Sequence, residues 1–276
     1  MPASTTTCAR RKGKNDGRLH QATPVRLLST LLRAKLLRLQ LDTALVDDMV
    51  LGCVMPVSEH CDDSARTAVP DADSARMVAG MTHSRYCASG LESVNLAAAK
   101  VASGYADVVV AGGVESMGRW AMGSDGGARF MNPRIDQKLD FVHQYQKERQ
   151  RRGHGQVGRQ LRGDGQHGFG SHRAVQVHDG GAHTHMLHAG NSSGIVFGAA
   201  LMLAGSREGG ATAGLKPRAC SGVATVIGSE PTIMLTGPTP ACQKALRKAG
   251  MQASNIDLSG GQRSLRRDAH ENRAPP

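Results

Sequence analysis

The sequence predicts an α/β fold built on a parallel sheet, and three observations support that prediction. The segment "DDMVLGCVM" at 47–55 is almost continuously apolar, as expected of a strand buried on both faces. A strand, a helix and a second strand follow one another with short joints between 77 and 113, which is a βαβ unit with a right-handed crossover. Hydrophobic residues make up 39% of the 276 residues and aromatic residues only 3%, so aliphatic side chains and methionine must form the core.

The N-terminal part begins with a basic stretch and continues into a helix. Residues 1–22 contain no apolar run, so we expect a flexible lead-in and no secretory signal. Thr23 is a suitable N-cap for a helix over 23–42, and Pro24 suits the first helical turn. Leucines recur along this segment at helical spacing, namely Leu27, Leu28, Leu31, Leu32 and Leu36.

The βαβ unit follows. A helix rich in small residues packs closely between layers, so we place the helix of this unit near the centre of the fold. In order, the sequence predicts a helix fragment broken at Pro70, a strand over 77–82, a turn that holds Cys87, a helix over 88–103 and a strand over 106–113.

Residues 143–188 differ in composition from the rest of the chain. They hold eight of the twelve histidines, and seven Lys or Arg against three acids. Without helical or alternating periodicity the segment buries too little apolar area to offset its ordering entropy, so we expect disorder. His183, His185 and His188 have metal-like spacing, but without a fixed scaffold incidental chelation is the favoured interpretation, and we assign no metal ligand.

Ordered structure is expected again over 189–258, whereas 259–276 is polar and follows no pattern. Turn residues and apolar runs alternate in the ordered part. In order, we predict a strand after the turn cluster at 190–194, a strand over 219–228, a helix over 239–250 that ends at Gly250, and the start of a strand at 255–258.

The totals exclude several classes of protein. A net charge of +11 and a pI near 9.8 favour anionic partners. However, the Arg-Gly run at 149–170 lacks interleaved aromatic residues, so we expect no specific nucleic-acid binding. The six cysteines form no C-x-x-C pair, which argues against a zinc site or a disulfide framework and for a reduced cytoplasm. No apolar stretch is long enough to span a membrane.

Cys87 is the candidate nucleophile. It immediately precedes the predicted helix over 88–103, whose free backbone N–H groups and dipole stabilise a thiolate. Gly90 permits a ligand to approach the backbone closely. These are the needs of a cysteine that forms a covalent thioester. The alternative is a buried structural cysteine, which position alone favours.

The residues around Cys87 change that balance. The stretch "CASGLESVNLAAAKVASGYADVVVAGGVESMGR" strongly resembles the thiolase family, the acyl-CoA acetyltransferases. Further blocks, "ALVDDMVLGCV", "AGNSSGIVFGAA", "GLKPRA" and "TGPTPACQKALRKAGMQASNIDL", follow the family's order. The resemblance covers about residues 10–142 and 189–258.

The resemblance implies a layered α-β-α-β-α fold of two similar halves, with the C-terminal half incomplete. It divides the chain into a lead-in at 1–22, an N-terminal thiolase-like domain at 23–142, a divergent segment at 143–188 in place of the lid domain, a partial C-terminal domain at 189–258, and a tail at 259–276.

The resemblance also implies the chemistry. Cys87 takes an acyl group from an acyl-CoA, and Ser193 matches a position that lines the coenzyme A pantetheine. Coenzyme A thioesters such as acetyl-CoA are then substrates in fatty-acid or acetoacetyl-CoA metabolism, and no resident cofactor is expected. Family members are dimers or tetramers, so we expect a homo-oligomer or a thiolase-like partner.

This sequence departs from the family pattern in its C-terminal part. It lacks the family's Asn-Glu-Ala-Phe, Gly-His-Pro and Cys-x-Gly motifs, and the only histidine after Ser193 is His270. Cys220 and Cys242 fall on a predicted strand and helix, so we interpret both as structural or incidental. Impaired activity is therefore expected, and the alternative is a catalytically dead thiolase-like subunit that associates with an intact paralogue. Translation of a shifted reading frame would explain both 143–188 and 259–276.

Overall fold

The structure is a computed structural model of the full chain. Its described residues fall into two compact units, one formed by 1–126 with 195–224 and the other by 127–194 with 225–276. Described are residues 3–9, 13–14, 19–60, 62–117, 119–120, 124, 174–176, 182–184, 196–229 and 237–260.

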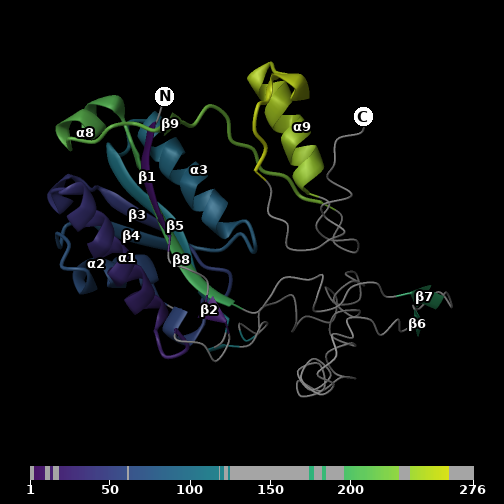
Figure 1. The fold of residues 1–276 in the computed structure, drawn as a ribbon, viewed down its shortest axis with the longest axis horizontal. Helices are drawn as coiled ribbons and strands as arrows, with labels where there is room; N and C mark the ends of the chain where they lie inside the picture. Colours follow the sequence, from purple (N-terminus) through teal and green to yellow (C-terminus); the bar gives the residue numbers. More distant parts are fainter. Residues whose placement is uncertain are drawn as a thin grey trace. The chain divides into compact units, whose positions relative to one another are not determined.

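A mixed seven-stranded sheet organises the first unit (Figure 1). Its order is β4-β3-β5-β8-β1-β9, and β2 also pairs with β8. The strands β4, β3 and β5 are parallel, and β8 runs antiparallel to β5 over the whole of β5. The bounds are β1 Ala3–Ala9, β2 Gly13–Lys14, β3 Asp48–Gly52, β4 Ala79–His83, β5 Val108–Ser116, β8 Val196–Gly205 and β9 Ala219–Cys220.

Helices cover both faces of this sheet. Successive strand residues point to opposite faces, so Met49 and Leu51 pack against α1 and α2 while Val50 packs against α3. All three side chains are fully buried, which explains the unbroken apolar run that predicted β3. The helices are α1 Pro24–Leu39, α2 Ser64–Asp71, α3 Ser89–Ala102 and α8 Arg207–Thr212, with 3₁₀ turns η1 Thr43–Leu45 and η2 Ser58–His60.

The central predictions are confirmed. The chain is α/β, β3 and β4 are parallel to β5, and α3 connects β4 to β5. Thr23 caps α1, because its hydroxyl oxygen accepts a hydrogen bond from the Arg26 N–H at 3.3 Å. The predicted helix break at Pro70 is displaced by two residues, since α2 ends at Asp71 with Pro70 inside its last turn.

The N-terminal lead-in is different from the prediction. Residues 1–22 contain β1 and β2, and both pair with β8. The sequence of β1, "ASTTTCA", is rich in β-branched threonine, and this strand signal is short and polar beside the basic residues around it. Long-range pairing with β8 supplies what the local pattern lacks.

The strand β8 is confirmed, but its sheet is that of the N-terminal elements. Val108 to Ser116 pair in register with Gly205 to Phe197. Residues assigned from the sequence to a partial C-terminal domain, 189–258, therefore contribute a strand to the first unit.

Two predicted strands are wrong. Over 219–228 only Ala219 and Cys220 form a strand, and residues 255–258 form none. In the second unit α9 Pro238–Ala249 matches the predicted helix, and Gly250 ends it in the left-handed conformation with φ of 66°. The 3₁₀ turn η3 Ala253–Asn255 follows, and β6 Ala174–Gln176 pairs with β7 Ala182–Thr184 inside the segment where the sequence predicts disorder.

Membrane insertion by a helix finds no support in the part of the chain that the structure describes. Its helices are all too short or too polar to cross a bilayer.

Candidate active site

The Cys87 turn lies where the strand β4 gives way to the helix α3. β4 ends at His83 and α3 begins at Ser89, so Cys87 sits two residues before the first helical residue. Its side chain is exposed, as a nucleophile requires, and the alternative of a buried structural cysteine is wrong. Ala88, the N-cap of α3, makes no side-chain hydrogen bond, so no capping side chain occupies the amides of the first helical turn.

Backbone bonds and one hydroxyl fix the shape of this turn. The N–H groups of Ala88 and Ser89 donate to the carbonyls of Arg85 and Tyr86 at 3.1 and 3.0 Å. The buried Ser89 hydroxyl accepts from the Arg85 N–H at 2.7 Å and donates to the Tyr86 carbonyl at 2.5 Å. Tyr86 is held with φ of 49°, in the left-handed region that residues other than glycine rarely adopt. The turn that presents Cys87 is therefore a strained conformation supported by its neighbours.

Glycine at the end of β3 allows the start of α3 to lie against the sheet. A Cβ on Gly52 would lie 2.4 Å from the carbonyl carbon of Ser89 and 2.7 Å from the Gly90 nitrogen. Contacts this short cannot persist, so a side chain at this position would force the backbone of Ser89 and Gly90 to shift. Gly52 thus sets how deeply the helix terminus beside Cys87 sits on the sheet.

Side chains of α3 continue this support. Arg85 forms an ion pair with the buried Glu92 at 2.9 Å, which links the turn to the helix. Ser93 donates its hydroxyl proton to the Ser89 carbonyl at 3.0 Å, so the His83 Nε2, 2.9 Å from the Ser93 oxygen, must be the donor in that contact. Burial lowers the pKa of His83, with Glu92 raising it and Arg85 lowering it to smaller extents.

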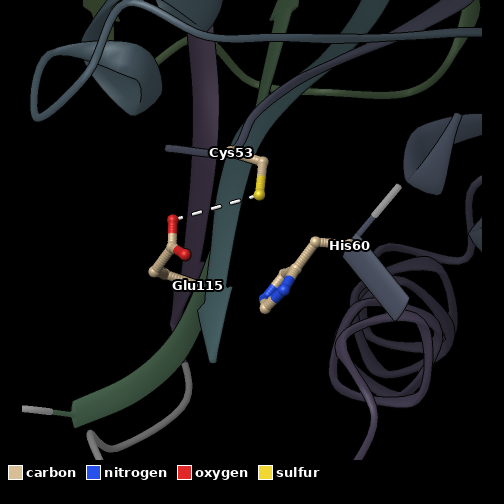
Figure 2. Close-up of side chains that lie close together, drawn as sticks. All are labelled: Cys53, His60 and Glu115. Carbon is tan, nitrogen blue, oxygen red and sulfur yellow. Dashed lines mark hydrogen bonds between the residues drawn. The ribbon is translucent and has the colours of Figure 1, made fainter. Parts of the chain in front are cut away.

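A second group of polar side chains lies at the ends of β3 and β5 (Figure 2). Cys53 follows β3, Glu115 is the penultimate residue of β5, and His60 ends η2. One candidate ligand atom from each residue lies within 4.8 Å of the other two, so this Cys53–His60–Glu115 cluster has the composition of a metal site. The sequence analysis missed it, because Glu115 is distant in the sequence from Cys53 and His60 and the three residues form no spacing motif.

Burial dominates the electrostatics of the cluster. It raises the pKa of the Cys53 thiol to about 12, with the charge of Glu115 as the second cause. Burial also raises the pKa of the Glu115 carboxyl and lowers that of His60. A thiol with so high a pKa is protonated and unreactive, which makes Cys53 unsuitable as a nucleophile in contrast to the exposed Cys87.

The other residues singled out from the sequence have different positions. Cys220 and Cys242 lie on β9 and α9 as predicted, but both are exposed. His183 lies on β7. The remaining candidates, Ser193, His185, His188, His270 and the basic run 149–170, lie outside the described residues.

Comparisons with known proteins agree on one family. The model of the thiolase N-terminal domain matches residues 6–148. A 3-ketoacyl-CoA thiolase of Acinetobacter baylyi is 31% identical, over 83% of this chain and 70% of that protein. A 3-oxoadipyl-CoA/3-oxo-5,6-dehydrosuberyl-CoA thiolase of Escherichia coli is 28% identical, over 79% of this chain and 69% of that protein.

The fold agrees as well. The crystal structure of the Bacillus anthracis acetyl-CoA acetyltransferase is similar with a TM-score of 0.69 and 24% sequence identity, over 98% of this chain and 82% of that one. The layered sheet, the helix that follows an exposed cysteine and the matched sequence therefore have one explanation: this chain belongs to the thiolase family.

Proposed function

We propose that this chain transfers acyl groups between coenzyme A thioesters through a thioester on Cys87. The observation that supports this most is the exposed Cys87 in a tight turn at the start of α3. The names of the relatives, which are thiolases acting on 3-ketoacyl-CoA and 3-oxoadipyl-CoA, point to the same reaction class. Acyl-CoA thioesters are then the substrates, within fatty-acid or acetoacetyl-CoA metabolism, and the cytoplasm is the proposed compartment because it keeps the thiol reduced.

The loading step uses the residues described above. The Cys87 sulfur attacks the thioester carbonyl carbon, a C–S bond forms, and the bond from that carbon to the coenzyme A sulfur breaks. The proton of the Cys87 thiol ends on the departing coenzyme A thiol. Backbone N–H groups at the α3 terminus favour the negative charge that develops, and the strained Tyr86 turn fixes the backbone that carries Cys87.

Ser193 is proposed to contact the pantetheine arm of coenzyme A, which follows from the sequence match alone. A Ser193→Ala variant would test this as a raised acetyl-CoA concentration at half-maximal loading, with the maximal loading rate unchanged. A changed maximal rate with an unchanged half-maximal concentration would contradict the assignment.

The test of the function is acyl loading of the full chain. Incubation with acetyl-CoA, followed by intact-mass measurement and peptide mapping, should give one acetyl adduct on Cys87 and none in Cys87→Ala. Cys220 and Cys242 are also exposed and serve as internal controls. Equal acetylation of these two cysteines would show non-specific chemistry and contradict the proposal.

We further propose that condensation is impaired relative to loading. Among the described residues no side chain hydrogen-bonds the Cys87 sulfur, so no general base of this part of the chain activates it. A positioned acid or base typically contributes about 10²–10⁴-fold to such a step. An acetoacetyl-CoA assay beside the loading assay measures the difference, and equal rates for the two steps would refute the impairment.

A subunit that associates with an intact thiolase, or with itself, is the second candidate. Two large apolar side chains beside Cys87 are exposed: Leu91 is 67% and Tyr86 60% exposed. Light scattering of the purified chain, alone and mixed with an intact paralogue, tests this, and a monomer in both samples would exclude it. No observation supports nucleic-acid binding as an alternative function, because the basic run 149–170 lies outside the described residues.

A further inference from the structure

The Cys53–His60–Glu115 cluster has a feature that the acyl-transfer chemistry does not use. Cys53 and His60 are 1% and 0% exposed, so the cluster is closed to solvent on the side of these two residues. The Cys53 thiol donates to Glu115 Oε2 at 3.9 Å, and the Val54 N–H donates to the same oxygen at 2.8 Å. Figure 2 shows the three side chains converging from separate segments.

Unpartnered polar atoms are concentrated at this cluster. His60 Nδ1, Glu115 Oε1 and the hydroxyl oxygen of Ser116 are all buried without a hydrogen-bond partner. A buried polar atom that makes no hydrogen bond is destabilising and native proteins contain few of them, so three in one place are unusual. Ser116 belongs to the same neighbourhood, because its N–H donates to His60 Nε2 at 2.9 Å.

We propose that Cys53, His60 and Glu115 bind a divalent transition-metal ion of the zinc class. Zinc accepts sulfur, nitrogen and carboxylate oxygen as ligands in one site, and three protein ligands leave one position for a small ligand. With zinc–ligand bonds of about 2.0–2.3 Å in a tetrahedron, neighbouring ligand atoms lie about 3.5 Å apart. The Cys53 Sγ–Glu115 Oε2 separation of 3.9 Å needs little contraction to reach that value.

The protons of the cluster have places to go when the metal binds. The Cys53 thiol loses its proton to solvent and becomes the thiolate ligand. His60 Nε2 accepts from Ser116, so the ring proton is on Nδ1 in the structure. A metal at Nδ1 moves that proton to Nε2, which then donates to the unpartnered Ser116 hydroxyl in place of accepting from the Ser116 N–H. Metal binding thus gives partners to His60 Nδ1 and to the Ser116 hydroxyl, while the Ser116 N–H loses His60 Nε2 as its acceptor.

The competing interpretation is a polar cluster that stays metal-free, with the His-rich segment 143–188 as the only place where metal ions collect. Thiolate coordination distinguishes the two, since imidazoles outside the cluster supply no sulfur. The probe is Co²⁺, whose thiolate complexes show a sulfur-to-metal charge-transfer absorption band in the near ultraviolet. The protein is the full chain with Cys87→Ala, Cys220→Ala and Cys242→Ala, which removes the exposed thiols of the described residues and leaves Cys8, Cys53 and Cys61.

Titration of this chain with Co²⁺ should give the thiolate band with saturation at one equivalent, and Zn²⁺ should displace it. Adding Cys53→Ser should abolish the band, and adding Ser116→Ala should weaken Co²⁺ binding about 10- to 100-fold through the lost support of His60. If the chain with the intact cluster shows no thiolate band, the proposal is overturned, whether or not any variant folds. A band that survives Cys53→Ser overturns it too, because another thiol must then hold the metal.

Glu115→Gln is the matched variant for the carboxylate. It keeps the shape of the side chain and its contact with the Val54 N–H, so the fold should be retained by circular dichroism. Loss of the negative charge should weaken Co²⁺ binding at least 10-fold, and unchanged affinity would remove Glu115 from the ligand set and contradict the proposed site.

Discussion

The helices α3 and α9 make an instructive comparison. Local signals are stronger in α9, which has proline at its start, basic residues in its last turn and Gly250 as its C-cap. α3 begins without proline and has one basic residue, Lys100, in its last turn, and the left-handed Gly104 follows its C-cap. Yet α3 buries six residues and α9 buries none. The strength of the local helix signal and the extent of tertiary burial are therefore separate properties of this chain.

The segments around the two helices differ in the same way. Between 48 and 116 the strands β3 and β5 bury nearly every side chain, and α3 packs against them through Ala97 and Val101. In the described residues from 219 to 260 no side chain is buried, and Leu258 is 91% exposed. Both segments match the family pattern in sequence, so the difference comes from the partners each segment has within the chain.

A leucine-to-alanine change in each of the two segments should give the largest difference in the free energy of unfolding. Leu28→Ala removes a fully buried side chain from the core and should lower the free energy of unfolding by about 2–5 kcal/mol. Leu258→Ala makes the same chemical change at an exposed site and should stay within about 0.5 kcal/mol. Urea unfolding followed by circular dichroism measures both. Similar losses for the two variants would mean that the 219–260 segment is packed in solution.

Close backbone contact gives the next effect. Gly52→Ala pushes a methyl group against the backbone of Ser89 and Gly90, and the resulting overpacking should cost about 1–3 kcal/mol. It should also slow acetylation of Cys87, since the start of α3 must move. Gly222→Ala is the control, because a Cβ there meets no atom within 4 Å. Normal acetylation in a folded Gly52→Ala protein would show that the helix terminus does not position Cys87.

The comparison of the helices also explains how far sequence reasoning reaches. Continuous apolar residues predict buried strands such as β3, and Thr23 and Pro24 predict the start of α1. Both signals are local in the sequence. β1 was missed because its pairing partner β8 is almost two hundred residues away in the sequence. The strands predicted at 219–228 and 255–258 were wrong for the converse reason. An apolar pattern alone does not make a strand where no neighbouring strand is present to pair with it.

The candidate site also has features that the sequence predicts and features that depend on the folded sheet. The sequence predicts Cys87 at the start of a helix, and the structure places it there, because turn and helix are adjacent in the chain. The left-handed Tyr86, the Gly52 contact and the Ser89 hydroxyl bonds depend on elements that meet only in the folded sheet. The Cys53–His60–Glu115 cluster is the extreme case, because 55 residues separate His60 from Glu115.

Capping of α1 gives a smaller effect. Thr23→Ala removes the hydroxyl that accepts from the Arg26 N–H and should cost about 1 kcal/mol. Thr23→Ser keeps the acceptor and should be nearly neutral. Because α1 is held by packing as well as by its cap, unfolding should remain cooperative in both variants, which urea curves at two wavelengths would check. A loss in Thr23→Ser as large as in Thr23→Ala would assign the effect to the methyl group and not to the cap.

The smallest expected change in stability is in α9 itself, and it tests the difference between α9 and α3 directly. Gly237, the N-cap of α9, supplies no side-chain hydrogen bond, and a Cβ there would have only ordinary contacts with Ser229 at 3.6 Å or more. Gly237→Asp adds an acceptor and a negative charge at the positive end of the helix dipole, so α9 should gain a few tenths of a kcal/mol. A helix without buried residues depends on such local terms, and the gain should therefore appear as slower amide hydrogen exchange across α9, while Gly237→Ala shows little change at the first-turn amides. If amide exchange in α9 is already as slow as in α3 and does not respond to Gly237→Asp, then a buried contact stabilises α9. The interpretation that α9 depends on local interactions is then refuted.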